Sequence, residues 1–218
     1  MKARGVILDV DGTLVASNDV HARAWWEVLC AAGYRVRVDQ LRRLIGMGSD
    51  KLLPAAVGVE KDSPEGKRLI RRRKAVFMDR YLPGLKPTPG ARELLEHLRA
   101  DGRTLVVASS AERDELRALL EIVGATDLVQ DTTTSSDVAE SKPDPDVVQS
   151  ALQKLGMPPE ETVMLGDTPY DVEAASRAHV PIIAVRCGGW SDPDLHGAIA
   201  VFDHPADVLR HSTQTVLA

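Results

Sequence analysis

The fold is decided by Gly5-Val6-Ile7-Leu8-Asp9-Val10-Asp11-Gly12-Thr13, a stretch close to the start of the chain. Its apolar part does not alternate with polar residues, which is typical of a strand covered on both faces in a parallel sheet. We therefore expect a strand over 5–10. Ligands of open α/β sheets bind beyond the carboxyl ends of the strands, so Asp9 and Asp11 stand where a site would form.

Further along the chain, short apolar runs repeat this pattern and helical segments separate them. The runs that predict strands are 103–108, 128–130, 162–165, 181–185 and 199–202. Three helical segments carry leucine and valine on one face and are followed by a glycine suited to a left-handed cap; they are 92–99, 114–123 and 144–155. This alternation predicts an α/β core with a Rossmann-like, doubly wound parallel sheet.

One segment interrupts the alternation. From about 18 to 82 no strand is indicated. Helices are expected over 38–45, 49–57 and 64–81, after a first helix that Asn18 could cap. We therefore expect an all-helical cap domain, inserted after the first strand and comprising 17–83. The α/β core domain would then consist of 1–16 and 84–218.

The composition limits the classes of function. The chain has 218 residues, 44% of them hydrophobic, and a net charge of −5. A general nucleic-acid binder would normally show a basic face, so no nucleic-acid partner is expected. The first apolar run, 6–8, is far too short for a signal peptide or a membrane span. We expect a cytoplasmic protein with no membrane partner, either a monomer or a homodimer.

Asp9 and Asp11 can be interpreted in two ways. Two carboxylates at one strand end repel each other unless they share a cation or a proton. A bound metal would relieve the repulsion, leaving one carboxylate as a nucleophile and the other as a proton donor and acceptor. The alternative is a pair of solvated acids, because Asp-Gly is a common turn dipeptide. These two residues alone do not decide between the interpretations.

A second acidic motif, Gly166-Asp167-Thr168-Pro169-Tyr170-Asp171, follows the apolar run at 162–165. Asp167 would lie at the end of that strand. Asp171 would lie in the first turn of the next helix, where an acid is also an ordinary capping residue. A third carboxylate at a second strand end is what a hard divalent ion needs, and Mg²⁺ prefers oxygen ligands.

Two weaker signals follow other elements. Ser109 and Ser110 end the run at 103–108, where hydroxyls and free N–H groups ahead of a helix can hold an anion. Lys142, in Ser141-Lys142-Pro143-Asp144-Pro145, precedes another helix and could balance a phosphate and the nearby acids. Taken singly, a serine that caps a helix and a solvated surface lysine are the more common explanations.

In this order, the four motifs resemble those of the haloacid dehalogenase superfamily, over nearly the whole chain. The matching segments are 9–15, Ser109, 142–145 and 166–171. The chain has a second acid, Asp11, two residues after Asp9. In this it resembles the phosphotransferases of the superfamily, whereas the dehalogenases lack that second Asp. The helical insert resembles the type-one cap. Within that subgroup the chain is similar to phosphoglycolate phosphatases and β-phosphoglucomutases.

The resemblance implies a Mg²⁺-dependent phosphatase that hydrolyses a small phosphorylated metabolite through an aspartyl-phosphate intermediate. Asp9 would be the nucleophile, and Asp11 would protonate the leaving group and later deprotonate water. Ser109 and Lys142 would hold the transferring phosphoryl oxygens, in keeping with the positioning and charge neutralisation that drive phosphoryl transfer. The implied magnesium ligands are Asp9, the Asp11 carbonyl, Asp167 and, in support, Asp171.

The resemblance also indicates a substrate site, formed by Thr13, His21, Gly46, Lys51, Ser109 and Ser110. A β-phosphoglucomutase-like sugar-phosphate mutase is the alternative. Such mutases carry an arginine near Ser49 that clamps a second phosphate, and a lysine where this chain has Glu112. Both departures favour the phosphatase. His21 is compatible with either activity, or with a local hydrogen bond alone. We interpret the basic run 71–74 as a solvated helix face.

Overall fold

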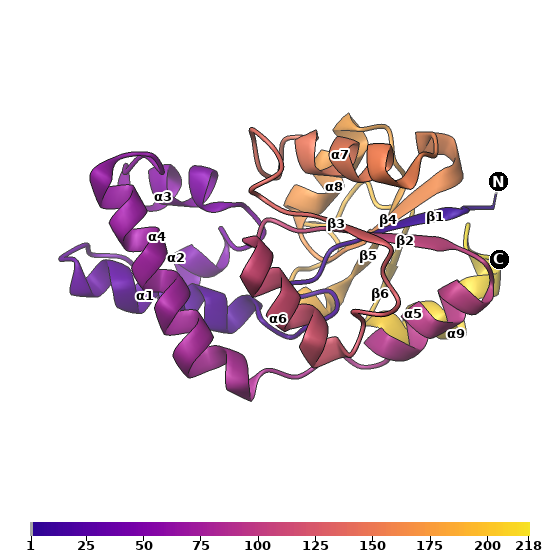
Figure 1. The fold of residues 1–218 in the computed structure, drawn as a ribbon, viewed down its shortest axis with the longest axis horizontal. Coiled ribbons are helices and arrows are strands. Elements are labelled where there is room, and N and C mark those ends of the chain that lie inside the picture. Colours follow the sequence, from indigo (N-terminus) through magenta and orange to yellow (C-terminus); the bar gives the residue numbers. More distant parts are fainter. Residues whose placement is uncertain (1) are drawn as a thin grey trace.

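Residues 2–218 are described by a computed structural model. Six parallel strands form one sheet in the order β3-β2-β1-β4-β5-β6 (Figure 1). The strands are β1 (Gly5–Leu8), β2 (Thr104–Ala108), β3 (Asp131–Thr133), β4 (Thr162–Gly166), β5 (Ile182–Val185) and β6 (Ala200–Phe202). The chain builds the sheet outward from β1 in one direction and then from β4 in the other. This confirms the doubly wound, Rossmann-like core expected from the sequence.

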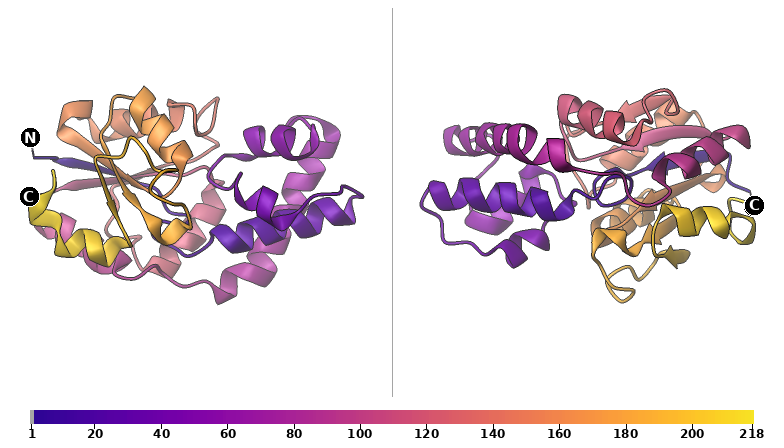
Figure 2. Two further views of the ribbon diagram at one scale, coloured as in Figure 1. Left: turned by 180° about the vertical axis from the view of Figure 1, so that it is seen from behind. Right: turned by 90° about the horizontal axis from the view of Figure 1, so that it is seen from below.

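Side chains of the central strands alternate between two helical layers. In β1, Val6 and Leu8 belong to the layer of α5 (Ala91–Ala100), α6 (Arg113–Val123) and α9 (Pro205–Arg210). Ile7 belongs to the layer of α7 (Asp146–Leu155) and α8 (Pro169–Arg177). Figure 2 shows the helices on both faces of the sheet. Since both faces are buried, the strands read as continuous apolar runs.

The segment after β1 forms a separate helical lobe beyond the carboxyl ends of the strands (Figure 1). Its helices are α1 (Asn18–Ala31), α2 (Val38–Arg42), α3 (Ser49–Val57) and α4 (Pro64–Val76). They enclose an apolar cluster of their own that includes Trp25, Leu41, Leu53 and Leu69. This confirms the all-helical cap inserted after the first strand. We propose 17–83 as its bounds, because the two connecting segments pair between Val15 and Pro87.

Short helical turns complete the chain. The π-helical turn Phe77–Tyr81 continues α4, and the 3₁₀ turn Leu82–Gly84 leads back to the core. Further 3₁₀ turns are Pro159–Glu161, Arg186–Gly188 and Ser212–Gln214. The two ends of the described chain lie side by side, far from the cap, where the Ala3 amide donates to the Val216 carbonyl at 2.8 Å (Figure 1). None of the helices over 2–218 is long and apolar enough to cross a bilayer.

The expected strand at 128–130 is wrong. The amides of Leu128 and Val129 both donate to the Ala125 carbonyl, so these residues form a turn, and their side chains pack against the core from it. The strand follows at Asp131–Thr133 and pairs with β2. Because β3 is an edge strand, it has a neighbour on one side only and needs little apolar character.

The expected cap of the first helix is also wrong. Ser17 occupies the N-cap position, and its side chain makes no capping hydrogen bond. Asn18 is the first helical residue instead. Its buried amide Nδ2 donates to Asp167 Oδ2 at 2.7 Å and to the Gly188 carbonyl at 3.1 Å. A tertiary contact therefore replaces the local role that the residue type suggested.

The cap is closed on the core through polar and aromatic contacts. The Arg43 guanidinium carbon lies 4.5 Å from the ring centroid of Trp190, which is buried in the core. The Arg43 carbonyl accepts a hydrogen bond from the Tyr170 hydroxyl at 2.5 Å, and Tyr170 packs edge-on against Trp190. At another point of the boundary, the Gly48 amide donates to Ser141 Oγ at 3.0 Å. The contacts at these two points of the boundary hold the cap over the carboxyl ends of the strands.

Candidate active site

Three acids and one lysine meet at the carboxyl ends of β1 and β4. Asp9 follows β1, Asp167 follows β4 and Asp171 lies in the first turn of α8. One carboxylate oxygen from each lies within 4.8 Å of the others. Lys142 Nζ is 2.6 Å from Asp9 Oδ1 and 2.7 Å from Asp171 Oδ1, and it donates to the Ala108 carbonyl at 2.9 Å. All four side chains are buried.

Two glycines leave room for this cluster. Gly12 has φ +82°, in the left-handed region that favours glycine, and turns the chain directly after Asp11. A Cβ there would overlap Asn18 and Asp167. A Cβ at Gly188 would overlap the Asp167 carboxylate. Both positions therefore admit no side chain beside Asp167.

Asp171 has two roles that the sequence left as alternatives. Its Oδ2 accepts hydrogen bonds from the Thr168 amide at 3.0 Å and the Thr168 hydroxyl at 2.7 Å, while the Thr168 hydroxyl also accepts from the Asp171 amide. These contacts form a capping box at the start of α8. Its Oδ1 pairs with the Lys142 ammonium at 2.7 Å. One oxygen thus caps the helix while the other faces the cluster.

The electrostatics of the cluster show an excess of buried negative charge. Burial raises the pKa of Asp9 to about 7, although Lys142 opposes the shift. Burial, together with the charges of Asp9 and Asp171, raises the pKa of Asp167 well above its usual range. Burial would lower the pKa of Lys142, but the two neighbouring carboxylates outweigh it and raise that pKa. One ammonium therefore does not neutralise the three carboxylates.

The donor set of this cluster fits a hard divalent cation. Three buried carboxylates with a single compensating charge are an oxygen-only site of the kind that Mg²⁺ prefers. The Lys142 ammonium lies against both Asp171 Oδ1 and Asp9 Oδ1, so these two carboxylates share a single positive charge. A divalent ion would supply the missing positive charge and favour the ionised form of Asp9 and Asp167.

The Asp11 carboxylate points away from these acids, toward the cap. Its Oδ1 accepts from Ser17 Oγ at 2.5 Å and lies 2.6 Å from His21 Nε2. Burial would raise the pKa of Asp11, but His21, Ser17 and the charge of Arg73 outweigh it and hold that pKa below its usual range. Any metal contact of Asp11 would thus come from its carbonyl oxygen, as the resemblance implied.

A chain of contacts links Asp11 to the cap and back to the core. His21 Nδ1 lies 2.7 Å from an Arg73 guanidinium nitrogen, and Arg73 also pairs with Glu115 on α6 at 2.6 Å. A guanidinium donates but cannot accept, so Nδ1 of His21 accepts and Nε2 carries the proton donated to Asp11. The imidazole stacks on Phe77 with centroids 4.1 Å apart. His21 is therefore held in place as a hydrogen-bond donor to Asp11.

The cap and core enclose a cleft of about 80 Å³ over Asp9 and Asp11. Cap residues on its wall include His21, Trp25, Gly46 and Ser49; core residues include Ser110, Glu112, Glu115 and Ser135. Ser110 Oγ donates to the Gly46 carbonyl at 3.2 Å across the boundary. The cleft is smaller than most ligand pockets, so it suits a small molecule.

The other residues expected at the site lie in different places. Buried Ser109 follows β2, and its hydroxyl accepts from the Ala111 amide at 3.0 Å. Thr13 donates to Asp167 Oδ1 at 2.9 Å and supports the acid cluster rather than the cleft wall. Lys51 pairs with Glu140 and, at 2.9 Å, with Asp144. It is not one of the described residues that line the cleft.

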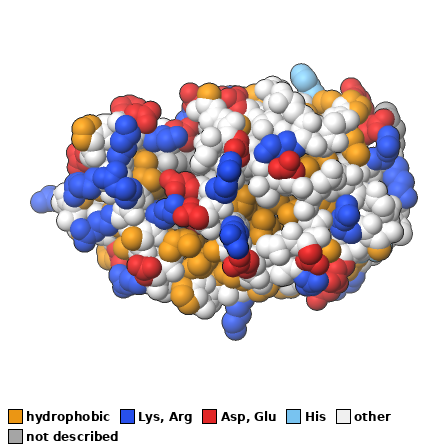
Figure 3. Space-filling model, in the orientation of Figure 1, with side chains coloured by type: hydrophobic (Ala, Val, Ile, Leu, Met, Phe, Trp, Pro, Cys, Tyr) orange, Lys and Arg blue, Asp and Glu red, His pale blue; other side chains and the backbone are white. Residues whose placement is uncertain are grey.

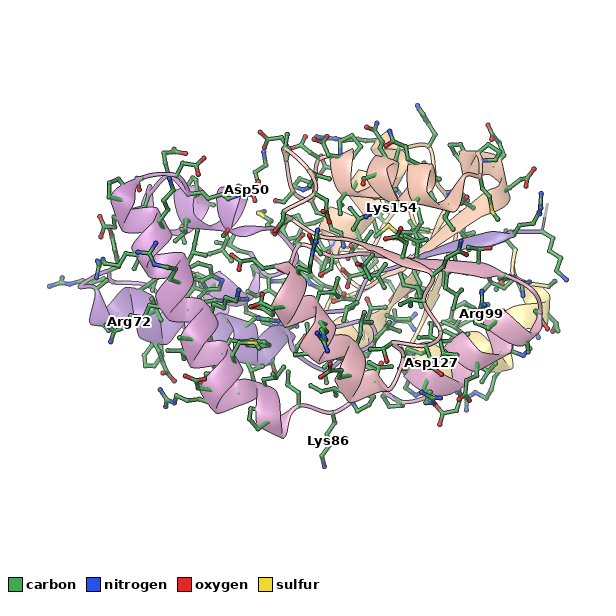
Figure 4. The ribbon with its side chains drawn as sticks, viewed as in Figure 1. Asp50, Arg72, Lys86, Arg99, Asp127 and Lys154 are labelled. Atoms are coloured by element: carbon green, nitrogen blue, oxygen red, sulfur yellow. The ribbon has the colours of Figure 1, made fainter. Side chains whose placement is uncertain are left out.

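Sequence reasoning missed Asn18, Arg73 and Glu115. Arg73 belongs to the basic run 71–74 that we interpreted as a solvated helix face. That interpretation is wrong for Arg73, whose side chain is 15% exposed, and for Lys74, whose side chain is 25% exposed, because both line the cleft. It is right for Arg72, which lies exposed on the outer side of α4 (Figure 4). The residue spacing along α4 does not show which residues of this basic run face the cleft and which face solvent.

Comparison with known proteins adds the family. Residues 6–185 match the model of the family described as haloacid dehalogenase-like hydrolase. A phosphoglycolate phosphatase of Rhodospirillum rubrum is 33% identical over 210 residues, covering 92% of this chain and 87% of that protein. A phosphorylated carbohydrates phosphatase of Thermotoga maritima is 30% identical over 179 residues, covering 80% and 81%. A solved hydrolase from Pseudomonas syringae has a TM-score of 0.90 at 29% identity, covering 97% of this chain and 98% of that one.

The chain belongs to the haloacid dehalogenase-like hydrolases. Within that family it is a phosphatase, an enzyme that hydrolyses phosphoric monoesters of small metabolites. Both the resemblance and the enzyme class expected from the four motifs are thereby confirmed.

Proposed function

We propose that this chain is a Mg²⁺-dependent phosphatase in which Asp9 forms an aspartyl-phosphate. The observation that carries the proposal is the position of Lys142 between Asp9 and Asp171, with Asp167 beside them. This arrangement supports an anionic nucleophile at Asp9 and a cationic group for a phosphoryl oxygen. Asp9, the Asp11 carbonyl and Asp167 would hold Mg²⁺, with Asp171 in support. The ion would neutralise charge on the phosphoryl oxygens.

The division of labour between the two acids follows from their surroundings. An Asp9 oxygen attacks phosphorus and the bond to the leaving alkoxide breaks, while Asp11 gives that alkoxide a proton. A bound phosphoryl dianion beside Asp11 favours the protonated form needed at this step. Asp11 then takes a proton from the water that attacks phosphorus; the bond from phosphorus to Asp9 breaks, and inorganic phosphate leaves. Its hydrogen bonds from Ser17 and His21 favour the ionised form that accepts this proton.

The remaining assignments concern the substrate and its surroundings. Ser109 and Ser110 would hold phosphoryl oxygens with Lys142, while Thr13 would support Asp167. His21 and Gly46 would face the leaving group. Lys51 would reach a substrate only after leaving Glu140 and Asp144. We further propose a cytoplasmic enzyme, monomeric or homodimeric, without a nucleic-acid partner.

The sugar-phosphate mutase has less support. Such an activity needs a second phosphate clamp in the cleft. Ser49 offers a hydroxyl there, and Glu112 offers a carboxylate, which repels phosphate. Conversion between sugar phosphates without net release of phosphate would overturn the preference for hydrolysis.

Hydrolysis of p-nitrophenyl phosphate with Mg²⁺ and with EDTA tests the proposal. We expect turnover with Mg²⁺ only, and a phosphorylated enzyme in rapidly quenched samples. Asp9→Asn should abolish both turnover and the adduct. Asp62→Asn, which changes an exposed acid of the cap, is the matched control and should retain both. Retained hydrolysis by Asp9→Asn would refute the nucleophile.

A further inference from the structure

We infer that the enzyme selects phosphomonoesters with an uncharged leaving alcohol and discriminates against leaving groups that carry a second anion. The inference rests on the proposed function, and it concerns the cleft wall beyond the acid cluster. A second carboxylate or phosphate on the substrate would need a cation there that is free to pair with it. The residues that line the cleft do not offer one.

Arg73 is the first of the two cations on this wall; both of its terminal nitrogens are paired, and its Nε, which has no hydrogen-bond partner in the described structure, is buried. One terminal nitrogen pairs with Glu115 at 2.6 Å, and the other donates to His21 at 2.7 Å. The guanidinium carbon lies 5.3 Å from the Phe77 ring centroid and 5.6 Å from that of Trp25. Glu115 is 1% exposed, so drawing Arg73 away would leave a buried carboxylate without its partner.

Lys74 is the second cation, and it lies between two carboxylates. Its Nζ is 2.6 Å from Glu112 on the cleft wall and 2.6 Å from Asp114. An anionic leaving group would have to compete with both carboxylates, one of which lines the same cleft. Lys74 is therefore neutralised before any substrate binds.

The loop that approaches the cleft from the cap adds no further cation. Gly46, Met47, Gly48 and Ser49 line the cleft, while Lys51 faces Glu140 and Asp144. Two wall cations thus oppose two wall carboxylates, Glu112 and Glu115. The wall also carries the Ser49, Ser110 and Ser135 hydroxyls. Those of Ser110 and Ser135 already donate to the Gly46 and Ala111 carbonyls, so they can accept from an alcohol but have no proton left for a carboxylate. The chemistry of the wall suits a small polyol or sugar alcohol.

Two pairs of substrates of nearly equal size test the inference. One pair is 2-hydroxyethyl phosphate and 2-phosphoglycolate, and the other is glycerol 3-phosphate and 3-phosphoglycerate. In each pair a CH₂OH group replaces a carboxylate. We expect kcat/KM to be at least about tenfold higher for the member of each pair that carries the CH₂OH group. The carboxylates of the cleft wall repel the carboxylate of the other member. Equal or higher kcat/KM for the carboxylates would overturn the inference.

A charge reversal at Glu112 localises the effect. Glu112→Lys releases Lys74 from one partner and adds a cation to the wall, so kcat/KM for 2-phosphoglycolate should rise about tenfold relative to 2-hydroxyethyl phosphate. Glu121→Lys makes the same charge change on α6, away from the cleft, and should leave the ratio unaltered. An equal change of the ratio in both variants would overturn the assignment to the wall.

The inference and the proposed function fail differently. If p-nitrophenyl phosphate is hydrolysed but neither matched pair is, the substrate class is wrong and the phosphatase stands. If no ester is hydrolysed with Mg²⁺, the proposed function fails and the inference fails with it.

Discussion

Lys142 is the residue on which the acid cluster depends. It is 1% exposed and contacts Asp9, Asp171 and the Ala108 carbonyl. Removing one partner of a buried ion pair leaves uncompensated charge, which costs about 3–5 kcal/mol. We expect Lys142→Met to lower the free energy of unfolding by about that amount without Mg²⁺, and to lower kcat/KM at least ~1000-fold.

Denaturant unfolding and steady-state kinetics measure these two effects. Lys86→Met is the matched control, because Lys86 is exposed in the loop before α5 and points away from the molecule (Figure 4). It should change neither quantity. A folded Lys142→Met enzyme with full activity would contradict the role of the lysine.

The raised pKa of Asp9 makes a prediction about pH and Mg²⁺. The pKa is about 7 in the folded, metal-free chain, against an ordinary value of 3.8. Between these values the folded state holds a proton that the unfolded state has lost, so this group's contribution to stability falls as the pH rises from 3.8 to 7. Mg²⁺ must displace that proton, and its affinity should fall about fivefold from pH 7 to pH 6.

Titration calorimetry at both pH values measures the affinity. Melting curves should agree, with a larger rise of Tm on adding Mg²⁺ at pH 8 than at pH 6. Asp9→Asn removes the titrating group and should flatten the dependence that Asp9 contributes. An affinity for Mg²⁺ that is the same at pH 6 and pH 8 would contradict the prediction.

At the scale of elements, α4 presents two neighbouring arginines with different surroundings. Arg73 holds His21 as a donor to Asp11, while Arg72 is exposed. We expect Arg73→Met to lower kcat about 10- to 100-fold with a smaller change of KM, because proton transfer by Asp11 loses its fixed partner. Arg72→Met should leave kcat unchanged. Equal kcat in the two variants would contradict the positioning of His21 by Arg73.

The same elements show how far the sequence could lead. The convergence of Asp9 and Asp167 was predictable, because the carboxyl ends of parallel strands meet at one edge of the sheet. Lys142 follows no strand directly, and only the family resemblance indicated its place in the site. The contact of Arg73 with Glu115 was not, because an amphipathic helix does not reveal which other helix it will meet. The strand at 131–133 was missed for a similar reason, since an edge position relaxes the apolar pattern.

At the scale of the whole molecule, charge is divided between the two parts. With the proposed bounds of 17–83, the cap contains 14 Lys and Arg against 8 Asp and Glu, whereas the rest of the chain contains 13 against 24. Figure 3 shows Lys and Arg side chains gathered over the cap. In each ion pair described between the two parts, the cap supplies the cation or histidine and the core the acid. Electrostatic attraction therefore favours the closed arrangement.

Salt should weaken this closure. Raising the salt concentration from about 0.01 M to 1 M shortens the Debye length from about 30 Å to about 3 Å. We expect the radius of gyration from small-angle scattering to rise over this range as the cap opens. Arg37→Met, which removes a cation paired within the cap, should leave the salt dependence unaltered. A radius of gyration independent of salt would contradict electrostatic closure.

The Arg43 guanidinium over Trp190 gives the enzyme a built-in optical signal. The indole is 8% exposed, and its N–H has no hydrogen-bond partner in the described structure. Opening of the cap would withdraw Arg43 and let water reach the ring, so the fluorescence of Trp190 should shift to longer wavelengths. The difference spectrum against Trp190→Phe isolates this emission from that of Trp25 and Trp26. Opening and closing can thus be timed in the unlabelled protein during turnover.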